Sequence, residues 1–200
     1  MDEIIVVIPT VRERAALCAE TVAQWQTLGY VPLICCMPDD APRSPEQQGR
    51  WALACLVHAQ EKRTSHALFC EDDVLLDGRI PAMLPRLAAA TYATTLYLPG
   101  KRFYPASIWR QPVPETPQLF AIRNHKQWFG AQCLYLPASL IAGLLSEQHA
   151  PAGFDILLRD YLIRHHMPLY SIYPNLVQHI SPPSVTSRRY KAHRSLTWMS

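Results

Sequence analysis

The chain has 200 residues, of which 49% are hydrophobic and 18% are charged, and its formal net charge is +3. These values are ordinary for one folded, soluble domain, and no apolar run is long enough to span a bilayer, so we expect no integral membrane segment. The N-terminus enters a strand-like run without a visible secretory signal, and the six cysteines contain no CxxC pair. We therefore expect buried free thiols and a cytoplasmic location.

The sequence up to residue 75 alternates between strand-like and helix-like segments. The expected elements are a strand at 3–8, a helix at 12–28, a strand at 31–37, a helix at 46–62 and a strand at 66–70. The strands are continuous apolar runs, which are typical of strands buried on both faces. This alternation predicts an α/β fold with a mostly parallel, Rossmann-like sheet flanked by helices.

The second half of the sequence is less regular. We expect a helix at 81–90, a strand at 94–98, a structured proline-rich loop at 99–117, strands at 119–123 and 131–136, helices at 137–149 and 153–166, and a strand at 169–173. The remainder of the chain is expected to be a basic tail. No acidic residue follows Asp160, and five Lys or Arg residues do, so this end is a candidate for contact with phosphate.

Polar residues follow each of the first three expected strands. They are Pro9-Thr10, Asp39-Asp40 and Glu71-Asp72-Asp73. In a parallel sheet these strand ends share one rim, which is where α/β proteins bind their ligands. Adjacent carboxylates at such a rim suit a hard cation that also binds substrate phosphate. A divalent cation at the acidic triplet is therefore the first hypothesis.

An acidic turn exposed to solvent is the simpler interpretation of this triplet. The flanking segments are apolar, however, with Ala-Leu-Phe-Cys at 67–70 and Val-Leu-Leu at 74–76. Carboxylates held between buried segments repel one another unless a cation or a basic side chain compensates. The context favours a binding site over a solvated loop.

Two motifs resemble those of GT-A-fold glycosyltransferases. The run Leu-Phe-Cys-Glu-Asp-Asp-Val at 68–74 is similar to their Asp-x-Asp signature, of which Glu-Asp-Asp is a variant. The run Tyr-Pro-Asn-Leu-Val-Gln-His-Ile at 173–180 is similar to a stretch of the branching N-acetylglucosaminyltransferases and of related bacterial and phage proteins. Ser181 stands where that stretch usually has Gly, which can alter the turn that positions His179.

The resemblance implies a single GT-A-like domain at 1–180 and a basic tail at 181–200. Within the domain, 1–76 would form a nucleotide-binding half and 77–180 an acceptor half. The implied activity is metal-dependent transfer of a sugar, and inversion at the anomeric carbon is the expected stereochemistry. The donor would be a nucleoside-diphosphate sugar, and UDP is the nucleotide usual in the family.

The same resemblance implies a site for a divalent metal. Asp73 is the expected principal ligand, and His179 would complete the metal shell from the C-terminal side. Imidazole beside carboxylates suits Mn²⁺ better than Mg²⁺. A histidine among apolar residues is also commonly structural, and that alternative stays open for His179.

A nucleotide pocket is implied as well. Its expected residues are Pro9, Thr10, Arg12, Arg50, Glu71 and Asp72. The two acidic residues would reach the ribose or a metal-bound water. Arg50 would reach the nucleotide from the helix that precedes the triplet.

Asp155 is the expected catalytic base. An inverting transferase needs a carboxylate that takes the proton from the acceptor hydroxyl. An aspartate near a helix start is also a common cap, which is the structural alternative. Trp128-Phe129-Gly130 offers either aromatic faces for a sugar or packing for the core.

The acceptor stays open at this point. A glycan, such as a lipid-linked one, a protein, a small molecule and a hydroxymethylated base in phage DNA are all compatible with the sequence. The basic tail, which includes Arg188, Arg189, Lys191 and Arg194, is either solvated, a lid over the diphosphate or a contact for nucleic acid.

Two other classes of function are also considered. A nucleotidyltransferase shares the α/β architecture and acidic ligands, but Pro-Thr-Val-Arg-Glu-Arg at 9–14 lacks the glycines of a phosphate loop. The remaining class is a nucleotide- or sugar-binding module without catalysis.

Overall fold

The computed structural model describes residues 4–40, 44–61, 66–99, 103–122 and 125–180. The first half contains β1 (Ile4–Val11), a 3-10 turn η1 (Arg12–Arg14), α1 (Ala15–Thr27), β2 (Leu33–Met37), α2 (Pro45–Glu61), β3 (His66–Cys70), β4 (Val74–Leu76) and α3 (Ile80–Ala88). The second half contains β5 (Thr94–Thr95), α4 (Ala106–Trp109), β6 (Gln118–Ala121), a 3-10 turn η3 (His125–Gln127), β7 (Cys133–Pro137), α5 (Ala138–Ser146), α6 (Phe154–Arg164), β8 (Tyr170–Tyr173) and β9 (Val177–His179).

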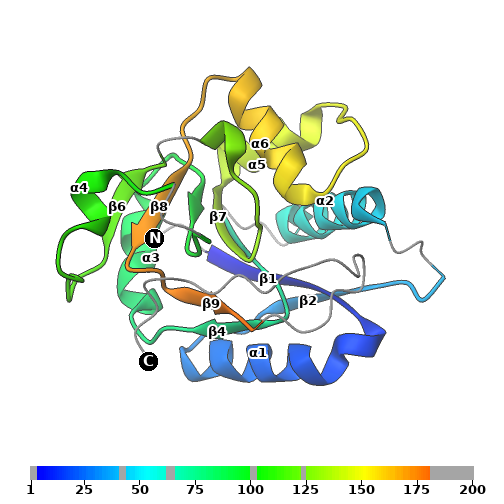
Figure 1. Cartoon of the computed structure of the whole chain (residues 1–200). Helices are drawn as coiled ribbons and strands as arrows, with labels where there is room; N and C mark the ends of the chain where they lie inside the picture. Colours follow the sequence, from blue (N-terminus) through cyan, green and yellow to red (C-terminus); the bar gives the residue numbers. More distant parts are fainter. Residues whose placement is uncertain (1–3, 41–43, 62–65, 100–102, 123–124, 181–200) are drawn as a thin grey trace.

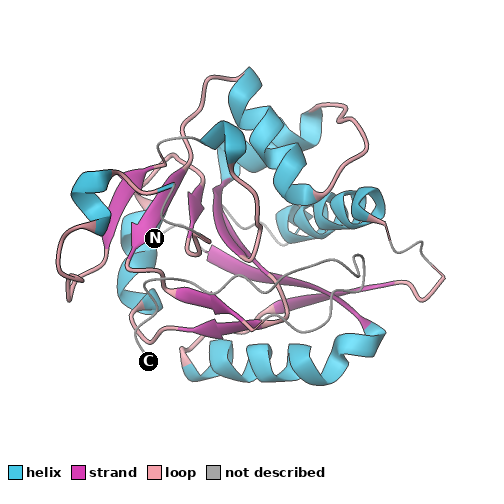
Figure 2. Cartoon of the chain, viewed as in Figure 1, coloured by secondary structure: helices cyan, strands magenta, loops and turns pink. Residues whose placement is uncertain are grey.

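The described strands form a seven-stranded sheet and a two-stranded sheet. The order in the large sheet is β2-β1-β3-β7-β5-β8-β6, and the small sheet pairs β4 with β9. Strands β2, β1, β3, β5 and β8 run in one direction, whereas β7 and β6 run against them. The expected α/β fold with a mostly parallel sheet is therefore confirmed (Figure 2).

Helices cover both faces of the large sheet. Side chains of α2, α5 and α6 pack on one face, and side chains of α1 and α3 pack on the other. Strand β3 shows why both layers form. Ala67 and Phe69 pack with the side chains of α2, α5 and α6, and Leu68 and Cys70 pack with those of α1 and α3. Because successive side chains of a strand alternate between faces, a continuous apolar run needs cover on both sides.

The small sheet was not expected from the sequence. Residues 74–76 were expected to continue an apolar stretch and residues from 174 onward to form a tail, but β4 and β9 pair in antiparallel fashion. Three-residue strands carry almost no periodicity, so only their pairing identifies them. In Figure 1 this small sheet lies between α1 and the large sheet.

Side chains of α1 hold β4 in place. Thr21 Oγ1 donates to the carbonyl of Asp72 at 2.9 Å, and Gln24 Nε2 donates to the carbonyl of Val74 at 3.1 Å. The Leu76 amide donates in turn to Gln24 Oε1 at 2.8 Å. Side chains of α1, the helix that follows β1, thereby satisfy backbone groups of the acidic segment and of β4.

Two smaller differences concern the boundaries of elements. The helix expected from Arg12 begins at Ala15, after the η1 turn, and the loop expected at 99–117 contains the short helix α4. The division of the domain at residue 76 stays a prediction. Strand β7, from the second half, pairs directly with β3, from the first half.

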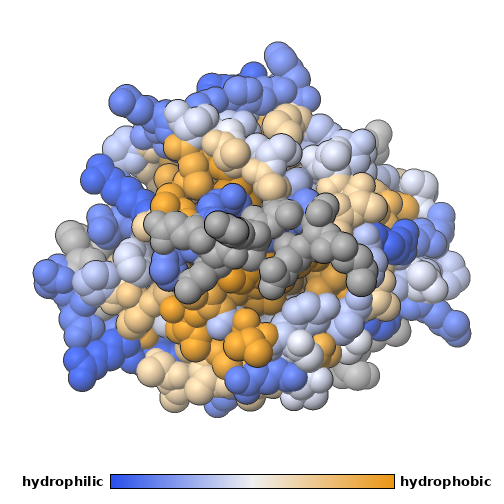
Figure 3. Space-filling model, turned by 180° about the vertical axis from the view of Figure 1, so that it is seen from behind, coloured by the Kyte–Doolittle hydropathy of each residue, from blue (hydrophilic) through white to orange (hydrophobic). Residues whose placement is uncertain are grey.

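Two hollows formed by the described residues differ in character. One is lined by apolar residues and glycine without a charged side chain, and it lies between the start of β1 and α3. Apolar side chains also gather over the lower part of the face in Figure 3, with polar residues around them. The other hollow lies at the carboxyl ends of β1 and β3 and is lined by the acidic triplet Glu71-Asp72-Asp73.

Candidate metal and nucleotide site

The polar pocket collects residues from seven separated parts of the chain. Its volume is about 330 Å³. It is lined by Pro9, Thr10, Val11, Arg14, Met37, Pro45, Gln48, Trp51, Ala52, Phe69, Glu71, Asp72, Asp73, Phe129, Gly130, Ala131, Gln132, Gly153, Phe154, Asp155 and His179. Seven of the expected site residues are among them: Pro9, Thr10, Glu71, Asp72, Asp73, Asp155 and His179.

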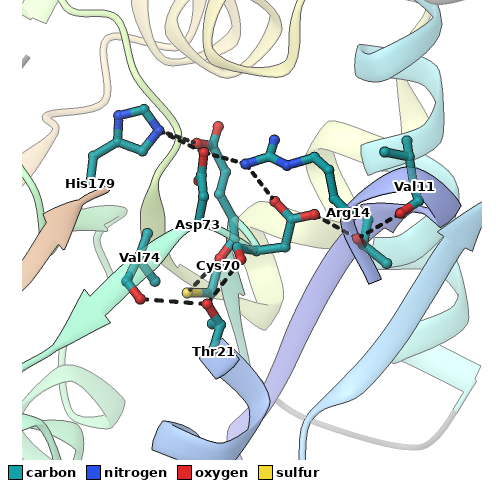
Figure 4. Close-up of polar contacts among 10 residues, drawn as sticks. Val11, Arg14, Thr21, Cys70, Asp73, Val74 and His179 are labelled. Atoms are coloured by element: carbon teal, nitrogen blue, oxygen red, sulfur yellow. Dashed lines mark hydrogen bonds and ion pairs between the residues drawn. The ribbon is translucent and has the colours of Figure 1, made fainter. Parts of the chain in front are cut away.

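Pairing of β4 with β9 brings His179 to the acidic triplet. Val74 lies opposite His179 in the register, and the Ile180 amide donates to the carbonyl of Asp73 at 2.8 Å. His179 Nε2 consequently lies 2.9 Å from Asp73 Oδ2 and 3.8 Å from Glu71 Oε2. Figure 4 shows His179 and Arg14 approaching Asp73 from opposite sides.

Glu71, Asp73 and His179 can hold a metal ion. One ligand atom from each lies within 4.8 Å of the others. The side chain of Asp73 is only 5% exposed, and its Oδ1 atom has no hydrogen-bond partner among the described residues. A buried carboxylate oxygen without a partner is costly, and a cation in this cluster would satisfy it. The donor set of two carboxylates and one imidazole fits a divalent transition ion such as Mn²⁺.

The electrostatics of the cluster are those of crowded carboxylates. Burial raises the pKa of Glu71 to about 8, and the charge of Asp73 adds to that rise. For Asp73 burial acts upward too, but the hydrogen bond from His179 and the charges of His179 and Arg14 outweigh it, so its pKa is lowered. Burial would lower the pKa of His179, yet the bond to Asp73 raises it.

Asp72 points toward β1 rather than toward His179. Thr10 Oγ1 donates to its Oδ2 at 2.5 Å, and Arg14 Nη2 lies 3.1 Å from its Oδ1. Burial raises the pKa of Asp72, and Arg14 and Thr10 oppose the rise. Asp72 thus links the end of β1 to the acidic triplet, on the side of the pocket where a nucleotide was expected.

Arg14 is the basic residue of the pocket, and the sequence reasoning missed it. Its guanidinium contacts Asp72 and Asp73, and its side chain is 19% exposed. Burial lowers the pKa of Arg14, but the charges of Asp73 and Asp72 outweigh burial and raise it. Arg12 and Arg14 both belong to the 3-10 turn η1, and only the fold shows which of the two faces the pocket.

Arg12 and Arg50 do not line the pocket. Arg12 Nη1 pairs with Asp39 Oδ2 at 2.9 Å, and both side chains are largely exposed. Arg50 pairs with Glu46 one turn earlier on α2 at 2.6 Å, and its side chain is 65% exposed. The structure therefore does not bring these two residues, or Asp39, to the nucleotide side of the site.

Asp155 reaches the pocket from the first turn of α6. Its Oδ2 accepts a hydrogen bond from the Gly130 amide at 3.0 Å, and its Oδ1 accepts one from the amide of the next residue, Ile156, at 2.8 Å. Gly130 has φ +103°, a conformation that glycine adopts without strain. Asp155 thus holds the loop before β7 through the Gly130 amide, and it also lines the pocket.

Apolar side chains also line the pocket. Trp51 and Ala52 of α2 line it together with Phe69 and Phe129. Trp128, in contrast, is fully buried in the core, so of the pair Trp128 and Phe129 only Phe129 lines the pocket. The basic residues Arg188, Arg189, Lys191 and Arg194, and also Ser181, lie outside the described residues.

Comparisons with known proteins address the fold. The sequence matches no protein-family model and no curated protein. Its structure is similar to Drosophila β-1,4-galactosyltransferase 7, in a mutant complexed with manganese, UDP-Gal and xylobiose, with a TM-score of 0.55, 9% identity, and coverage of 98% of this chain and 76% of that one. It is also similar to protein A197 from STIV, with a TM-score of 0.50, 14% identity, and coverage of 90% of this chain and 86% of that one.

These likenesses have low sequence identity, and they concern the fold alone. Among the described residues, no helix is both long enough and apolar enough to cross a membrane. The sheet order, the rim position of the acidic triplet and the superposition on a galactosyltransferase agree with one another. The chain has a GT-A-like fold.

Proposed function

We propose that this protein is a metal-dependent glycosyltransferase that uses a nucleoside-diphosphate sugar, with UDP as the nucleotide. The observation that carries the proposal is the cluster of Glu71, Asp73 and His179, in which a buried Asp73 oxygen has no hydrogen-bond partner among the described residues. The cluster lies in a pocket at the carboxyl ends of β1 and β3, where α/β folds bind ligands. The galactosyltransferase neighbour, which is complexed with manganese and UDP-Gal, agrees with this choice of ligands.

Within this proposal, Asp73 and His179 hold the cation and Glu71 supplies a further oxygen. When bound, such a cation neutralises charge on the departing diphosphate. Mn²⁺ is preferred over Mg²⁺ because imidazole is among the ligands. Pro9, Thr10 and Asp72 form the nucleotide side of the pocket.

Asp155 is proposed as the base that accepts the proton of the acceptor hydroxyl at a side-chain oxygen, which makes the reaction inverting. Its carboxylate lies in the same pocket as the metal cluster but on another element, as a base facing the sugar must. The apolar side chains of the pocket, Phe129 among them, would exclude water from the donor sugar. The acceptor group is a hydroxyl.

The direct test is a thermal-denaturation panel of nucleotide sugars with and without Mn²⁺. We expect a UDP-sugar to raise the melting temperature only when Mn²⁺ is present. Asp73→Asn removes the effect because the cation loses its principal ligand, whereas Asp39→Asn, which alters an exposed carboxylate paired with Arg12, keeps it. Absence of any stabilising nucleotide sugar for the unaltered protein would contradict the proposal.

A binding module without catalysis is the second candidate. The observation that favours it is that both oxygens of Asp155 already accept backbone amides, as a purely structural aspartate would. Asp155→Asn decides between the two functions once an active donor is known. A base role predicts a fall in turnover of about 10²- to 10⁴-fold with donor binding retained. Asp160→Asn is the matched control on the same helix, because Asp160 pairs with Arg159 outside the pocket.

A further inference from the structure

Arg14 occupies a position in the metal cluster that a cation would also seek. Its Nη2 atom contacts Asp73 Oδ2, which is the same oxygen that lies 2.9 Å from His179 Nε2. The second contact of Nη2 is Asp72 Oδ1 at 3.1 Å. One guanidinium therefore bridges the two buried carboxylates of the triplet.

The surroundings of Arg14 make this bridge the main charge balance of the site. Glu71, Asp72 and Asp73 lie in consecutive positions, and the latter two side chains are 4% and 5% exposed. The charge of Asp73 is the largest influence that favours the charged form of Arg14, followed by that of Asp72. Without a metal ion, the guanidinium supplies the compensation that buried carboxylates require.

A divalent cation at Asp73 would bring a second positive charge against this bridge. An ion held by Asp73 and His179 would lie close to Arg14 Nη2, because His179 Nε2 and Arg14 Nη2 both contact Asp73 Oδ2. Positive charges at contact distance repel strongly at the effective dielectric constant of a protein interior. The cation and the guanidinium therefore compete for the same carboxylate.

We propose that Arg14 is an internal competitor of the metal, which is displaced from Asp73 when a divalent cation binds and is then stabilised by an anionic group of the nucleotide. This inference rests on the proposed function for the identity of the nucleotide. It adds that cation and nucleotide bind with positive coupling, because a diphosphate that attracts Arg14 removes the competitor from Asp73. By linkage, the cation strengthens nucleotide binding by the same factor.

The test is a titration with Mn²⁺ in the absence of nucleotide, followed by the electron paramagnetic resonance of free Mn²⁺. Arg14→Met retains the apolar stem and removes the competing charge, so its affinity for Mn²⁺ should be tighter than that of the unaltered protein by on the order of tenfold or more. Arg14→Lys retains a charge and should bind with an affinity between the two. Arg79→Met is the matched control, because Arg79 makes a half-buried pair with Asp77 outside the pocket, and its affinity should not change.

A second titration measures the coupling. UDP should tighten Mn²⁺ binding several-fold in the unaltered protein and much less in Arg14→Met. Equal or weaker Mn²⁺ binding by Arg14→Met would overturn the inference and leave the proposed metal site standing. Failure of every variant and of the unaltered protein to bind Mn²⁺ would overturn both.

Thermal denaturation separates competition from a merely structural role. Arg14→Met should melt at a lower temperature than the unaltered protein without metal, because its carboxylates lose their counter-ion. Saturating Mn²⁺ should raise the melting temperature of Arg14→Met by more than it raises that of the unaltered protein. A residue needed only for folding would lower both melting temperatures equally, and that result would count against the inference.

Discussion

Asp73 and His179 are 106 positions apart, yet their side chains meet at 2.9 Å because β4 and β9 are paired. The register places Val74 opposite His179, so the residue before β4 lies beside the last residue of β9. Both side chains are almost fully buried. Two short strands therefore decide whether the acidic triplet is a turn or part of a metal site.

Replacing His179 should weaken Mn²⁺ binding more than it weakens the fold. His179→Ala removes the imidazole and should lower the affinity by at least about 10- to 100-fold, which is the loss typical even of outer-shell partners. Isothermal titration with Mn²⁺ measures the change. His165→Ala is the control, since His165 pairs with Glu147 away from the pocket. Similar affinities for the two variants would show that His179 is structural.

The metal-free protein should lose stability as the pH rises from about 5 to about 8. The pKa of Glu71 is raised from 4.5 to about 8, so within this window the folded state holds a proton that the unfolded state has released. Stability falls with pH wherever the folded state binds more protons. His179 acts in the same direction, because its raised pKa means that the stabilising imidazolium contact fades as the pH passes through that value.

Mn²⁺ should reverse this trend, because its binding requires deprotonated ligands. The rise in melting temperature caused by Mn²⁺ is therefore expected to grow between about pH 6 and about pH 8. Glu71→Gln removes the titrating group and should flatten the dependence. A rise in melting temperature that is constant across these pH values would contradict the assignment of Glu71 to the cluster.

Gly130→Ala should destabilise the loop that Asp155 holds. Gly130 has φ +103°, and a Cβ atom there would lie 2.5 Å from Oε1 of Gln132. The expected loss is about 1–3 kcal/mol in the free energy of unfolding, measured with urea. Gly78→Ala is the matched control, because a Cβ at Gly78 meets nothing within 4 Å. Equal stability of both variants would show that the loop adjusts freely.

Thr21→Val should loosen the backbone of the acidic triplet. The fully buried Thr21 hydroxyl donates to the carbonyl of Asp72, and valine has nearly the same shape without a donor. A buried carbonyl that loses a hydrogen-bond donor lowers the free energy of unfolding by about 1–3 kcal/mol. Thr27→Val removes an equivalent bond, to the carbonyl of Ala23, from the exposed side of α1. Urea denaturation should show a clearly larger loss for Thr21→Val than for Thr27→Val.

Much of the large sheet could be predicted from local sequence. The apolar runs of β1 and β3 and the periodic helix α2 lie within a few residues of the expected ranges, because burial on two faces or on one helical face leaves a pattern in the chain. The position of the acidic triplet at the rim followed from the alternation of strands and helices. That part of the site depends on order along the chain, which the sequence contains.

Tertiary structure alone decided which charged side chains meet. Arg14 rather than Arg12 enters the pocket, because the direction of a side chain on a 3-10 turn depends on the packing around it. His179 reaches Asp73 through a pairing of two three-residue strands, which neither strand encodes by itself. Sequence by itself determined the layers and the acidic rim, while long-range packing decided the partners of Asp73, since contacts between distant segments are set by the free energy of the whole fold.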